Sequence, residues 1–500
     1  MNSRPNIIFI ITDHHAYYRH DREGEFSYRW PVFEEFAASG VEFTRAYTVC
    51  PLCSPARASM MTGLYPSVHG MRWNTEARHS SNLSDLRPGQ LLYSHYLSQA
   101  GYRNAYVGKW HCGSERLPID YGIEGWSLPD YGKVYMSEAY RKYAQERGFG
   151  DARAHIEYNL NCPEWNGKTL TLHDPSPWRF MNGSGVLEGP PEAHEEFFVA
   201  DLAIEKLKEL SQSSQPFSLV VSFWGPHQPY FPTEPYASMI DPDSIPEYPS
   251  FGDDLSERPL RHLFHREMSH RSAEAWPEWQ TWQKILARCY GQGIQIDAAV
   301  GSFLQTLEEL ELSEDSLIIW CADHGDAVAS HGGLWDKAST YIEEVARIPF
   351  AVRWPSRIEA GSRVERLISN MDATATMLDA ADAPIPHEMD SRSLLPLCMW
   401  PDDASWPDQL VCEHHGHGDI LTQRIIIHDR YKYVAALFDM DELYDLESDP
   451  YEMTNLINAP EYADVRDDLR GRLIDFLEPA AARNRDVAKL LLSLRLFSNR

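Results

Sequence analysis

Short apolar runs recur along the chain, and longer segments richer in polar residues separate them. Residues 6–12 read Asn-Ile-Ile-Phe-Ile-Ile-Thr, a continuous β-branched stretch of the kind found in strands buried on both faces. Comparable runs lie at residues 41–43, 104–107, 217–223, 316–321 and 348–352. The pattern therefore predicts a series of strands, most of them fully buried.

Amphipathic segments lie between these runs and predict helices. These segments are residues 31–37, 91–99, 197–210 and 282–311, and a further helix is predicted to begin at residue 53. The alternation of strands and helices predicts an α/β fold, with a large, mostly parallel sheet flanked by helices. Two stretches, residues 114–190 and 232–280, show no such pattern, and we expect them to be irregular surface excursions that shape a pocket.

The pattern changes near residue 385, where Pro384 and Pro386 mark a linker. Three short runs, at residues 410–413, 423–428 and 431–435, predict antiparallel strands. Residues 442–446 follow, and residues 463–477 predict a helix. We therefore expect a large α/β domain over residues 1–384 and a smaller α+β domain over 385–500. The amphipathic tail at 487–500 either docks on its own chain or contacts a second subunit, which would make a homo-oligomer.

The composition narrows the class of protein. Hydrophobic residues make up 43% of the chain, which allows a large core. Acidic residues outnumber basic ones by 74 to 45, and the net charge of −29 disfavours nucleic acid as a partner. An anionic substrate would therefore need cations gathered locally at its site.

The sequence shows no pattern typical of membrane insertion or export. No apolar stretch reaches the roughly 18–20 residues of a membrane helix, and the run at residues 7–11 is too short for a signal peptide. We therefore expect a cytoplasmic protein with no membrane partner. The eight cysteines lack paired zinc-type spacing, which favours free thiols over a disulfide framework.

Ionisable residues follow four of the predicted strands. The groups are Asp13-His14, Lys109 with His111, His227, and Asp323-His324. Ligands of open α/β sheets bind beyond the carboxyl ends of the strands, so four such groups at one edge indicate a site. Each residue alone also fits a helix cap or a hydrogen-bonded core position.

These residue types suit a metal and an anion. Carboxylates and imidazoles bind divalent cations, and Arg57, Lys109 and Lys337 could hold a tetrahedral oxyanion beside the metal. His111 and His227 are candidates for acid–base chemistry near neutral pH. A surface charge is the simpler explanation for each cation taken singly.

Cys53 begins a predicted helix, and Arg57 follows four residues later. The start of a helix and a nearby cation both favour an anion, so this arrangement fits a reactive thiol. A half-buried structural cysteine in a turn fits equally well. The local sequence leaves both explanations open.

Several segments, in order along nearly the whole chain, resemble the sulfatase family. Residues 53–57, Cys-Ser-Pro-Ala-Arg, are similar to its Cys-x-Pro-x-Arg signature. Further similar segments are Gly-Lys-Trp-His at 108–111, Gly-Pro-His at 225–227, Asp-His-Gly at 323–325, Trp-Asp-Lys at 335–337 and Glu-Leu-Tyr-Asp-Leu at 442–446. The resemblance is to the formylglycine-dependent sulfatases of the alkaline phosphatase superfamily, and it implies an alkaline-phosphatase-like fold.

The resemblance implies two cofactors. Cys53 would be converted to formylglycine by a formylglycine-generating enzyme. One divalent metal, Ca²⁺ in that family, would be bound by Asp13, His14, Cys53, Asp323 and His324. The substrate would be a small-molecule or carbohydrate sulfate ester, with Arg72 and Asn74 as further contacts.

The resemblance also implies roles in sulfate ester hydrolysis. The metal-bound hydrate of the aldehyde at position 53 would attack sulfur, while Arg57, Lys109 and Lys337 hold the sulfuryl oxygens. His227 would protonate the leaving oxygen. His111 would then take the proton of the second hydroxyl, so that inorganic sulfate leaves and the aldehyde re-forms.

One residue departs from the family pattern. The family usually has Asp-Asp after the first strand, and here it is Asp13-His14. An imidazole favours Mn²⁺ or Zn²⁺ over Ca²⁺, unless His14 does not coordinate at all. Phosphonate monoester hydrolases and phosphodiesterases also carry a non-carboxylate there, so hydrolysis of those esters is the alternative function.

Two further interpretations stay open. An inactive relative acting as a binding protein would have lost a central group, and all of them are present. The segment 413–417, Glu-His-His-Gly-His, either reaches the pocket from the smaller domain or serves a structural role.

Overall fold

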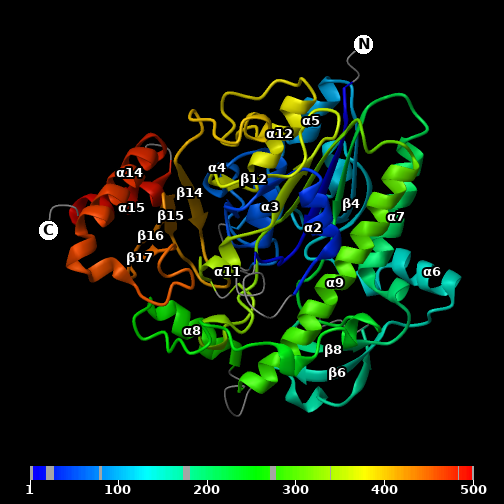
Figure 1. Cartoon of the computed structure of the whole chain (residues 1–500), viewed down its shortest axis with the longest axis horizontal. Helices are drawn as coiled ribbons and strands as arrows, with labels where there is room; N and C mark the ends of the chain where they lie inside the picture. The colour runs from blue at the N-terminus through cyan, green and yellow to red at the C-terminus, as the bar shows by residue number, and fades with distance from the viewer. Residues whose placement is uncertain are drawn as a thin grey trace.

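The computed structural model describes residues 4–17, 28–77, 82–172, 181–270, 278–337, 339–481 and 484–497. Figure 1 shows a large central sheet with helices on both faces, and a small sheet with two helices at the C-terminal side. The eight strands of the large sheet have the order β12-β2-β11-β10-β1-β9-β4-β5. The predicted α/β fold with a small antiparallel sheet at the C-terminus is confirmed.

Four parallel strands form the centre of the large sheet. They are β10 (Ser316–Ala322), β1 (Asn6–Thr12), β9 (Phe217–Ser222) and β4 (Arg103–Lys109). The outer strands are β5 (Glu124–Leu128), β11 (Phe350–Arg353), β2 (Val41–Phe43) and β12 (Ser362–Val364). Only β11 runs antiparallel to its neighbours, so the sheet is mostly parallel.

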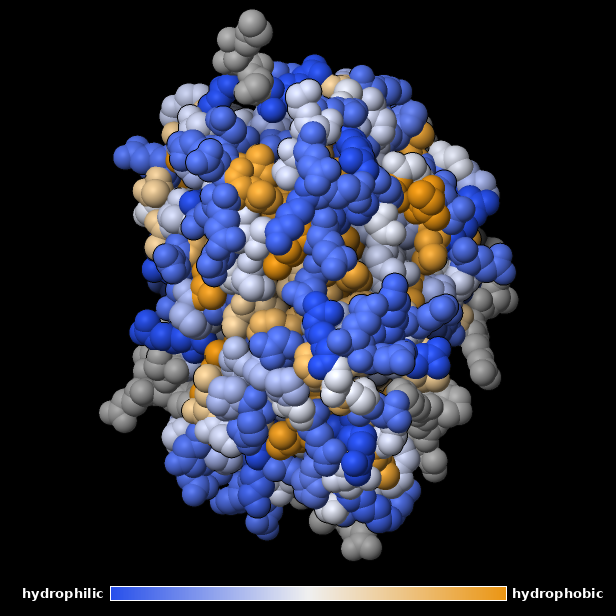
Figure 2. Space-filling view, turned by 90° about the vertical axis from the view of Figure 1, so that its right-hand side faces the viewer, coloured by the Kyte–Doolittle hydropathy of each residue, from blue (hydrophilic) through white to orange (hydrophobic). Residues whose placement is uncertain are grey.

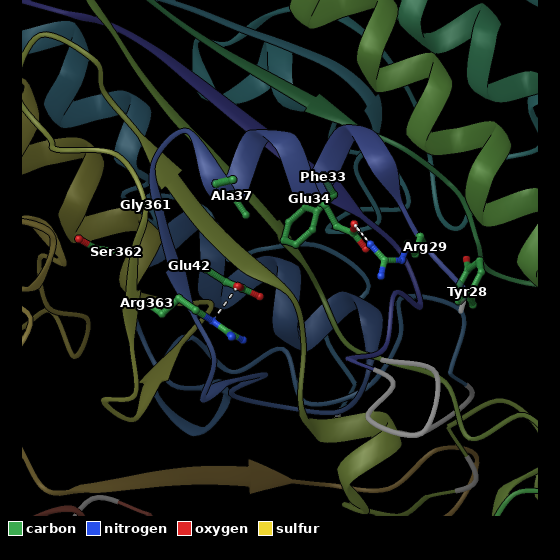
Figure 3. A pocket seen from close by; sticks show the side chains of 10 residues that line it. Tyr28, Arg29, Phe33, Glu34, Ala37, Glu42, Gly361, Ser362 and Arg363 are labelled. Carbon is green, nitrogen blue, oxygen red and sulfur yellow. Dashed lines mark hydrogen bonds and ion pairs between the residues drawn. The ribbon is translucent and has the colours of Figure 1, made fainter. Parts of the chain in front are cut away.

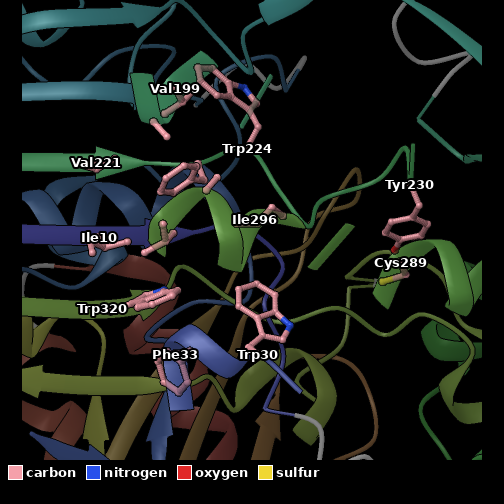
Figure 4. Packing of buried hydrophobic residues seen from close by; sticks show 14 of the residues in the cluster. Ile10, Trp30, Phe33, Val199, Val221, Trp224, Tyr230, Cys289, Ile296 and Trp320 are labelled. Carbon is pink, nitrogen blue, oxygen red and sulfur yellow. The ribbon is translucent and has the colours of Figure 1, made fainter. Parts of the chain in front are cut away.

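Alternate side chains of the central strands feed two separate hydrophobic clusters. Ile8 and Ile10 belong to the cluster under α2 (Pro31–Ala38), α7 (Glu195–Leu210) and α9 (Trp279–Glu309). Figure 4 shows Ile10 and Val221 of the strands beside Trp320, Phe33 and Ile296 in this cluster. Because each such side chain is excluded from water, its burial contributes roughly 1.5–3 kcal/mol.

The opposite face of the sheet carries the second cluster. Ile7, Phe9 and Ile11 pack there with residues of α3 (Cys53–Thr62), α5 (Tyr93–Gln99) and α12 (Asp372–Ala380). The period of two along β1 therefore explains why a wholly apolar strand lies between two helical layers.

The two stretches expected to be irregular contain regular structure, so that prediction is wrong. A three-stranded antiparallel sheet joins β7 (Thr169–Thr171), β6 (Arg153–Asn159) and β8 (Gly183–Leu187), and helix α6 (Glu138–Arg147) lies nearby. Helix α8 (Leu260–His270) lies in the second stretch. In β6, the buried residues Ala154 and Ile156 alternate with exposed ones, as in a half-buried strand.

Short elements complete the large domain. They are β3 (Ala46–Tyr47), β13 (Ile368–Ser369), α4 (Pro66–His69), α10 (Ser330–Gly333), α11 (Glu343–Ala346) and α13 (Leu395–Met399). The face that carries α7 is mostly hydrophilic, with hydrophobic residues in small separate groups (Figure 2). Over the described part of the chain, no helix combines the length and hydropathy needed to span a bilayer.

The C-terminal sheet is antiparallel, as predicted. Its strands follow one another as β14 (Gln409–His414), β15 (Gln423–His428), β16 (Tyr431–Ala436) and β17 (Glu442–Asp445). Helices α14 (Ala463–Ala481) and α15 (Arg485–Phe497) share one hydrophobic cluster with this sheet. The tail therefore docks on its own chain, while a contact with a second subunit stays a prediction. All eight cysteines are buried free thiols, as expected.

Candidate active site

The carboxyl ends of the four central strands bring the predicted groups together. Asp13 follows β1, Lys109 ends β4, His227 lies beyond β9, and Asp323 follows β10. These strands are neighbours in one parallel array, so the residues that follow them meet at one edge. The structure thus gathers the residues that the sequence pattern singled out.

Cys53 is the first residue of α3. Leu52 before it is extended, and Gly63 ends the helix in the left-handed conformation, with φ of 69°. The Cys53 side chain is fully buried, and its Sγ lies 3.2 Å from His324 Nε2 and 3.9 Å from Asp13 Oδ1. The positive end of the helix and these neighbours make position 53 the centre of the cluster.

Arg57 lies one turn along α3 and holds the back of the site. Its Nε donates to Asp323 Oδ2 at 2.7 Å, and its Nη1 donates to Ser222 Oγ at 2.7 Å and to the Lys109 carbonyl at 3.0 Å. Burial raises the pKa of Asp323, but the charge of Arg57 outweighs this effect and lowers the pKa well below its usual range. Asp323 is therefore a carboxylate at neutral pH.

Four side chains form a candidate metal centre. Asp13, His14, Cys53 and His324 each offer a ligand atom within 4.8 Å of the others. Asp323 is adjacent, with its Oδ1 accepting the backbone N–H of His324 at 2.8 Å. Oxygen, nitrogen and sulfur donors in one buried cluster fit a divalent cation, so the chain's own residues suit the metal that the family resemblance implies.

His14 is held by Asp326, which the sequence analysis did not single out, and by Lys337, which it did. Its Nδ1 lies 3.0 Å from Asp326 Oδ2, which also accepts the Tyr230 hydroxyl at 2.7 Å. Its Nε2 lies 2.6 Å from Lys337 Nζ, and burial lowers its pKa well below the usual value. A neutral ring that donates from Nδ1 leaves the Nε2 lone pair free to accept from Lys337 or to bind a cation.

Two buried lysines border the cluster. Lys109 pairs with Asp13, and its Nζ lies 4.2 Å from the centre of the Tyr131 ring. Lys337 pairs with Asp336, whose charge outweighs burial and raises the lysine pKa. Lys337 therefore remains a cation, and both lysine side chains are placed to hold an anionic substrate.

The two predicted acid–base histidines have different surroundings. His111 Nε2 lies 3.1 Å from both carboxylate oxygens of Glu76; burial lowers its pKa, but Glu76 outweighs this and raises it overall. His227 donates from Nδ1 to the Gln228 carbonyl at 2.6 Å, and burial lowers its pKa. Glu76, like Asp326, is a partner that the sequence analysis missed.

Arg72 and Asn74 are bound to the chain itself. Arg72 pairs with Asp486 of α15 at 2.9 Å, and Asn74 Oδ1 accepts the backbone N–H of Ser54 at 3.1 Å. The latter bond satisfies an N–H at the start of α3, so Asn74 helps to fix position 53. Their role as substrate contacts stays a prediction.

The segment 413–417 divides between two tasks. Glu413 accepts hydrogen bonds from Ser67 and pairs with Arg424 at 3.1 Å, which ties the small sheet to α4. His417 lies 3.4 Å from Asp336, the partner of Lys337. One end of the segment is therefore structural, and the other borders the site.

A different pocket, of about 360 Å³, lies between α2 and the sheet edge near β12 (Figure 3). Its charged residues pair with one another, Arg29 with Glu34 and Arg363 with Glu42. None of the site residues predicted from the sequence lines this pocket. It is separate from the cluster around Cys53.

Comparison with known proteins agrees with this geometry. The family model described as sulfatase matches residues 5–383, and the one described as N-sulphoglucosamine sulphohydrolase, C-terminal, matches residues 330–478. An arylsulfatase of Clostridium perfringens is 26% identical, covering 98% of this chain and 97% of its own. A choline-sulfatase of Rhizobium meliloti is 28% identical, covering 91% and 83%.

Solved structures share the fold. A phosphonate monoester hydrolase from Silicibacter pomeroyi superposes with a TM-score of 0.75 at 21% identity, covering 96% of each chain. A protein in complex with its substrate D-glucosamine-2-N,6-O-disulfate gives 0.73 at 19% identity, covering 97% of this chain and 99% of the other. Because the sulfatase model matches most of the sequence, this chain belongs to the sulfatase family of sulfuric ester hydrolases.

Proposed function

We propose that this protein hydrolyses a sulfate monoester with a formylglycine made from Cys53 and one divalent metal. The observation that carries the proposal is the position of Cys53. It lies at the buried start of α3, in one cluster with Asp13, His14 and His324. Lys109 and Lys337 border the same cluster, so an anion placed on it would meet cations.

The metal would be held by Asp13, His14, His324 and the group at position 53, with Asp323 beside them. The bound cation would supply Lewis acidity and lower the pKa of an oxygen attached to it. Ca²⁺ is the ion that the family resemblance implies. The nitrogen donor of His14 favours Mn²⁺ or Zn²⁺ instead.

Formylglycine would supply, as its hydrate, one hydroxyl that attacks sulfur and a second whose deprotonation releases sulfate. Lys109, Lys337 and Arg57 would hold the sulfuryl oxygens. His227, with Nδ1 donating to the Gln228 carbonyl, would present Nε2 to the leaving oxygen and would protonate it from the imidazolium form. His111, which Glu76 orients and which interacts with the Cys53 side chain, would accept the proton of the second hydroxyl.

The expected partners follow from this chemistry. A formylglycine-generating enzyme would have to modify Cys53 before the chain folds around it, because the thiol is fully buried. The substrate is a small-molecule or carbohydrate sulfate ester. Relatives with the names arylsulfatase, choline-sulfatase and N-acetylglucosamine-6-O-sulfatase support this range.

Mass spectrometry tests the cofactor. In protein co-expressed with a formylglycine-generating enzyme, the tryptic peptide 46–57 should be about 18 Da lighter than its unmodified form. The same peptide contains Cys50, which should stay a thiol and serves as an internal control. Hydrolysis of 4-nitrophenyl sulfate should rise in proportion to the modified fraction, and full activity with a plain thiol at Cys53 would contradict the proposal.

Phosphonate monoester or phosphodiester hydrolysis is the second candidate function. The observation that favours it is His14, because an imidazole in place of a carboxylate removes negative charge from the site and would ease binding of other anions. The ratio of kcat/KM for 4-nitrophenyl sulfate and 4-nitrophenyl phenylphosphonate ranks the two. A ratio above one supports the sulfatase, and a ratio below one supports the alternative.

A further inference from the structure

A small pocket of about 80 Å³ lies next to the proposed sulfuryl site. Its lining includes Tyr131, Lys133, Tyr135, Glu195 and Pro229. The Tyr131 ring connects it to the site, with Lys109 Nζ 4.2 Å from the ring centre and the His227 ring 5.0 Å away, centre to centre. Pro229, two residues after His227, also lines the pocket, so the pocket lies beside the residue that would protonate the leaving group.

The pocket lining contains one carboxylate, Glu195, the first residue of α7. Among the residues that the structure describes, none forms a hydrogen bond or ion pair with its side chain. The charge of Lys109 acts on Glu195, but Lys109 is already paired with Asp13. Lys133, the other charged residue of the lining, has an exposed side chain at the rim.

Glu195 is in a poor place for an uncompensated charge. Glu195 is half-buried, and burial raises its pKa to about 8, so the charged form is disfavoured there. A cation bound in the pocket would offset that penalty. Tyrosine rings are the usual companions of a carboxylate where proteins bind ammonium groups, and Tyr131 and Tyr135 supply two.

We propose that the pocket is the leaving-group subsite and takes a positively charged group, an ammonium carried by the sulfated alcohol. Glu195 would be the counter-ion, and Tyr131 and Tyr135 would be the aromatic walls. The pocket has room for a few water molecules, which suits a small ammonium group rather than a second sugar ring. This inference rests on the proposed function, because it assigns the substrate class of the same site.

Two esters of equal shape test the charge. 3-(Trimethylammonio)phenyl sulfate and 3-tert-butylphenyl sulfate differ only in a nitrogen cation against a carbon. Their Kd values are measured by calorimetry on the Cys53→Ala variant, which cannot turn them over. The cationic ester should bind about tenfold or more tightly than the neutral one, as expected for a desolvated cation between aromatic rings and a carboxylate.

Glu195→Gln should abolish that preference without changing the Kd of the neutral ester. Glutamine keeps the shape and the hydrogen-bonding capacity, so loss of preference reports the charge. Glu192→Gln is the matched control, because Glu192 is exposed three residues earlier and does not line the pocket. If Glu195→Gln fails to fold, Tyr135→Leu replaces it, with weaker binding of the cationic ester alone as the expected result.

Equal Kd values for the two esters in the Cys53→Ala protein would overturn the proposal. So would a preference that survives Glu195→Gln, because the carboxylate would then not be its source. The proposed function fails separately: if formylglycine-bearing enzyme hydrolyses neither ester while the binding preference is present, the subsite stands and the reaction is wrong.

Discussion

The orientation of His14 by Asp326 offers the sharpest test of the metal centre. Asp326 Oδ2 accepts hydrogen bonds from His14 and from Tyr230, and all three side chains are buried. Asp326→Ala removes the acceptor of these two side chains and of the backbone N–H of Val328, which donates to Asp326 Oδ1 at 3.0 Å. Each unsatisfied donor costs about 1–3 kcal/mol, so the free energy of unfolding should fall by about 3–9 kcal/mol.

Metal affinity should fall as well, because the His14 ring would lose the contact that fixes its tautomer. Loss of such a partner typically weakens metal binding about 10- to 100-fold. Calorimetric titration of the folded variants with Mn²⁺ measures the effect. In a His14→Ala background, Asp326→Ala should weaken binding no further.

Asp297→Ala is a matched control for stability. Asp297 is also a buried carboxylate that accepts two hydrogen bonds, from the backbone N–H groups of Val32 and Phe33 at 2.7 and 2.9 Å. It should lose similar stability and keep full metal affinity. Wild-type affinity in folded Asp326→Ala would refute the assignment of His14 as a ligand.

Three further predictions concern other parts of the molecule. Glu76→Gln should lower kcat about 10- to 100-fold, because His111 loses the carboxylate that orients it; a rate equal to wild type would rule this out. Burial lowers the pKa of His69 to about 3, so below pH 6.5 the folded state binds fewer protons than the unfolded state. The free energy of unfolding should therefore fall as the pH drops from 6.5, by up to about 1.4 kcal/mol per pH unit. His69→Asn should reduce this slope, measured by urea titrations at several pH values. Leu473→Ala in α14 should lower the free energy of unfolding by about 2–5 kcal/mol and Leu492→Ala in α15 by under about 0.5, measured with guanidinium chloride, since Leu473 is fully buried under the small sheet and Leu492 is 60% exposed; similar costs would mean that α14 does not pack against this core.

The site could be located from the sequence because its main residues follow buried strands. A run such as 6–12 is apolar on both faces, so its local composition predicts a position in the middle of a sheet. Asp13 and Asp323 lie next to such runs, and parallel strands bring them to one edge without further information. The same logic placed Lys109 and His227.

Residues that act through tertiary contacts could not be found this way. Asp326 meets His14 across 312 positions of sequence, and Glu76 meets His111 from a loop with no periodic pattern. Both contacts depend on where the chain returns in space rather than on the local residues. Strand β6 is a different case, because its buried and exposed residues alternate as in any half-buried strand, so the local sequence does contain the signal.

The most direct test of the central claim compares wild type with Cys53→Ser in metal-loaded protein exposed to the modifying enzyme. With 4-nitrophenyl sulfate in excess, the wild type should release many equivalents of nitrophenol per protein molecule. The serine variant should release at most one, because serine has no second hydroxyl with which to expel sulfate. Sustained turnover by Cys53→Ser would contradict the account.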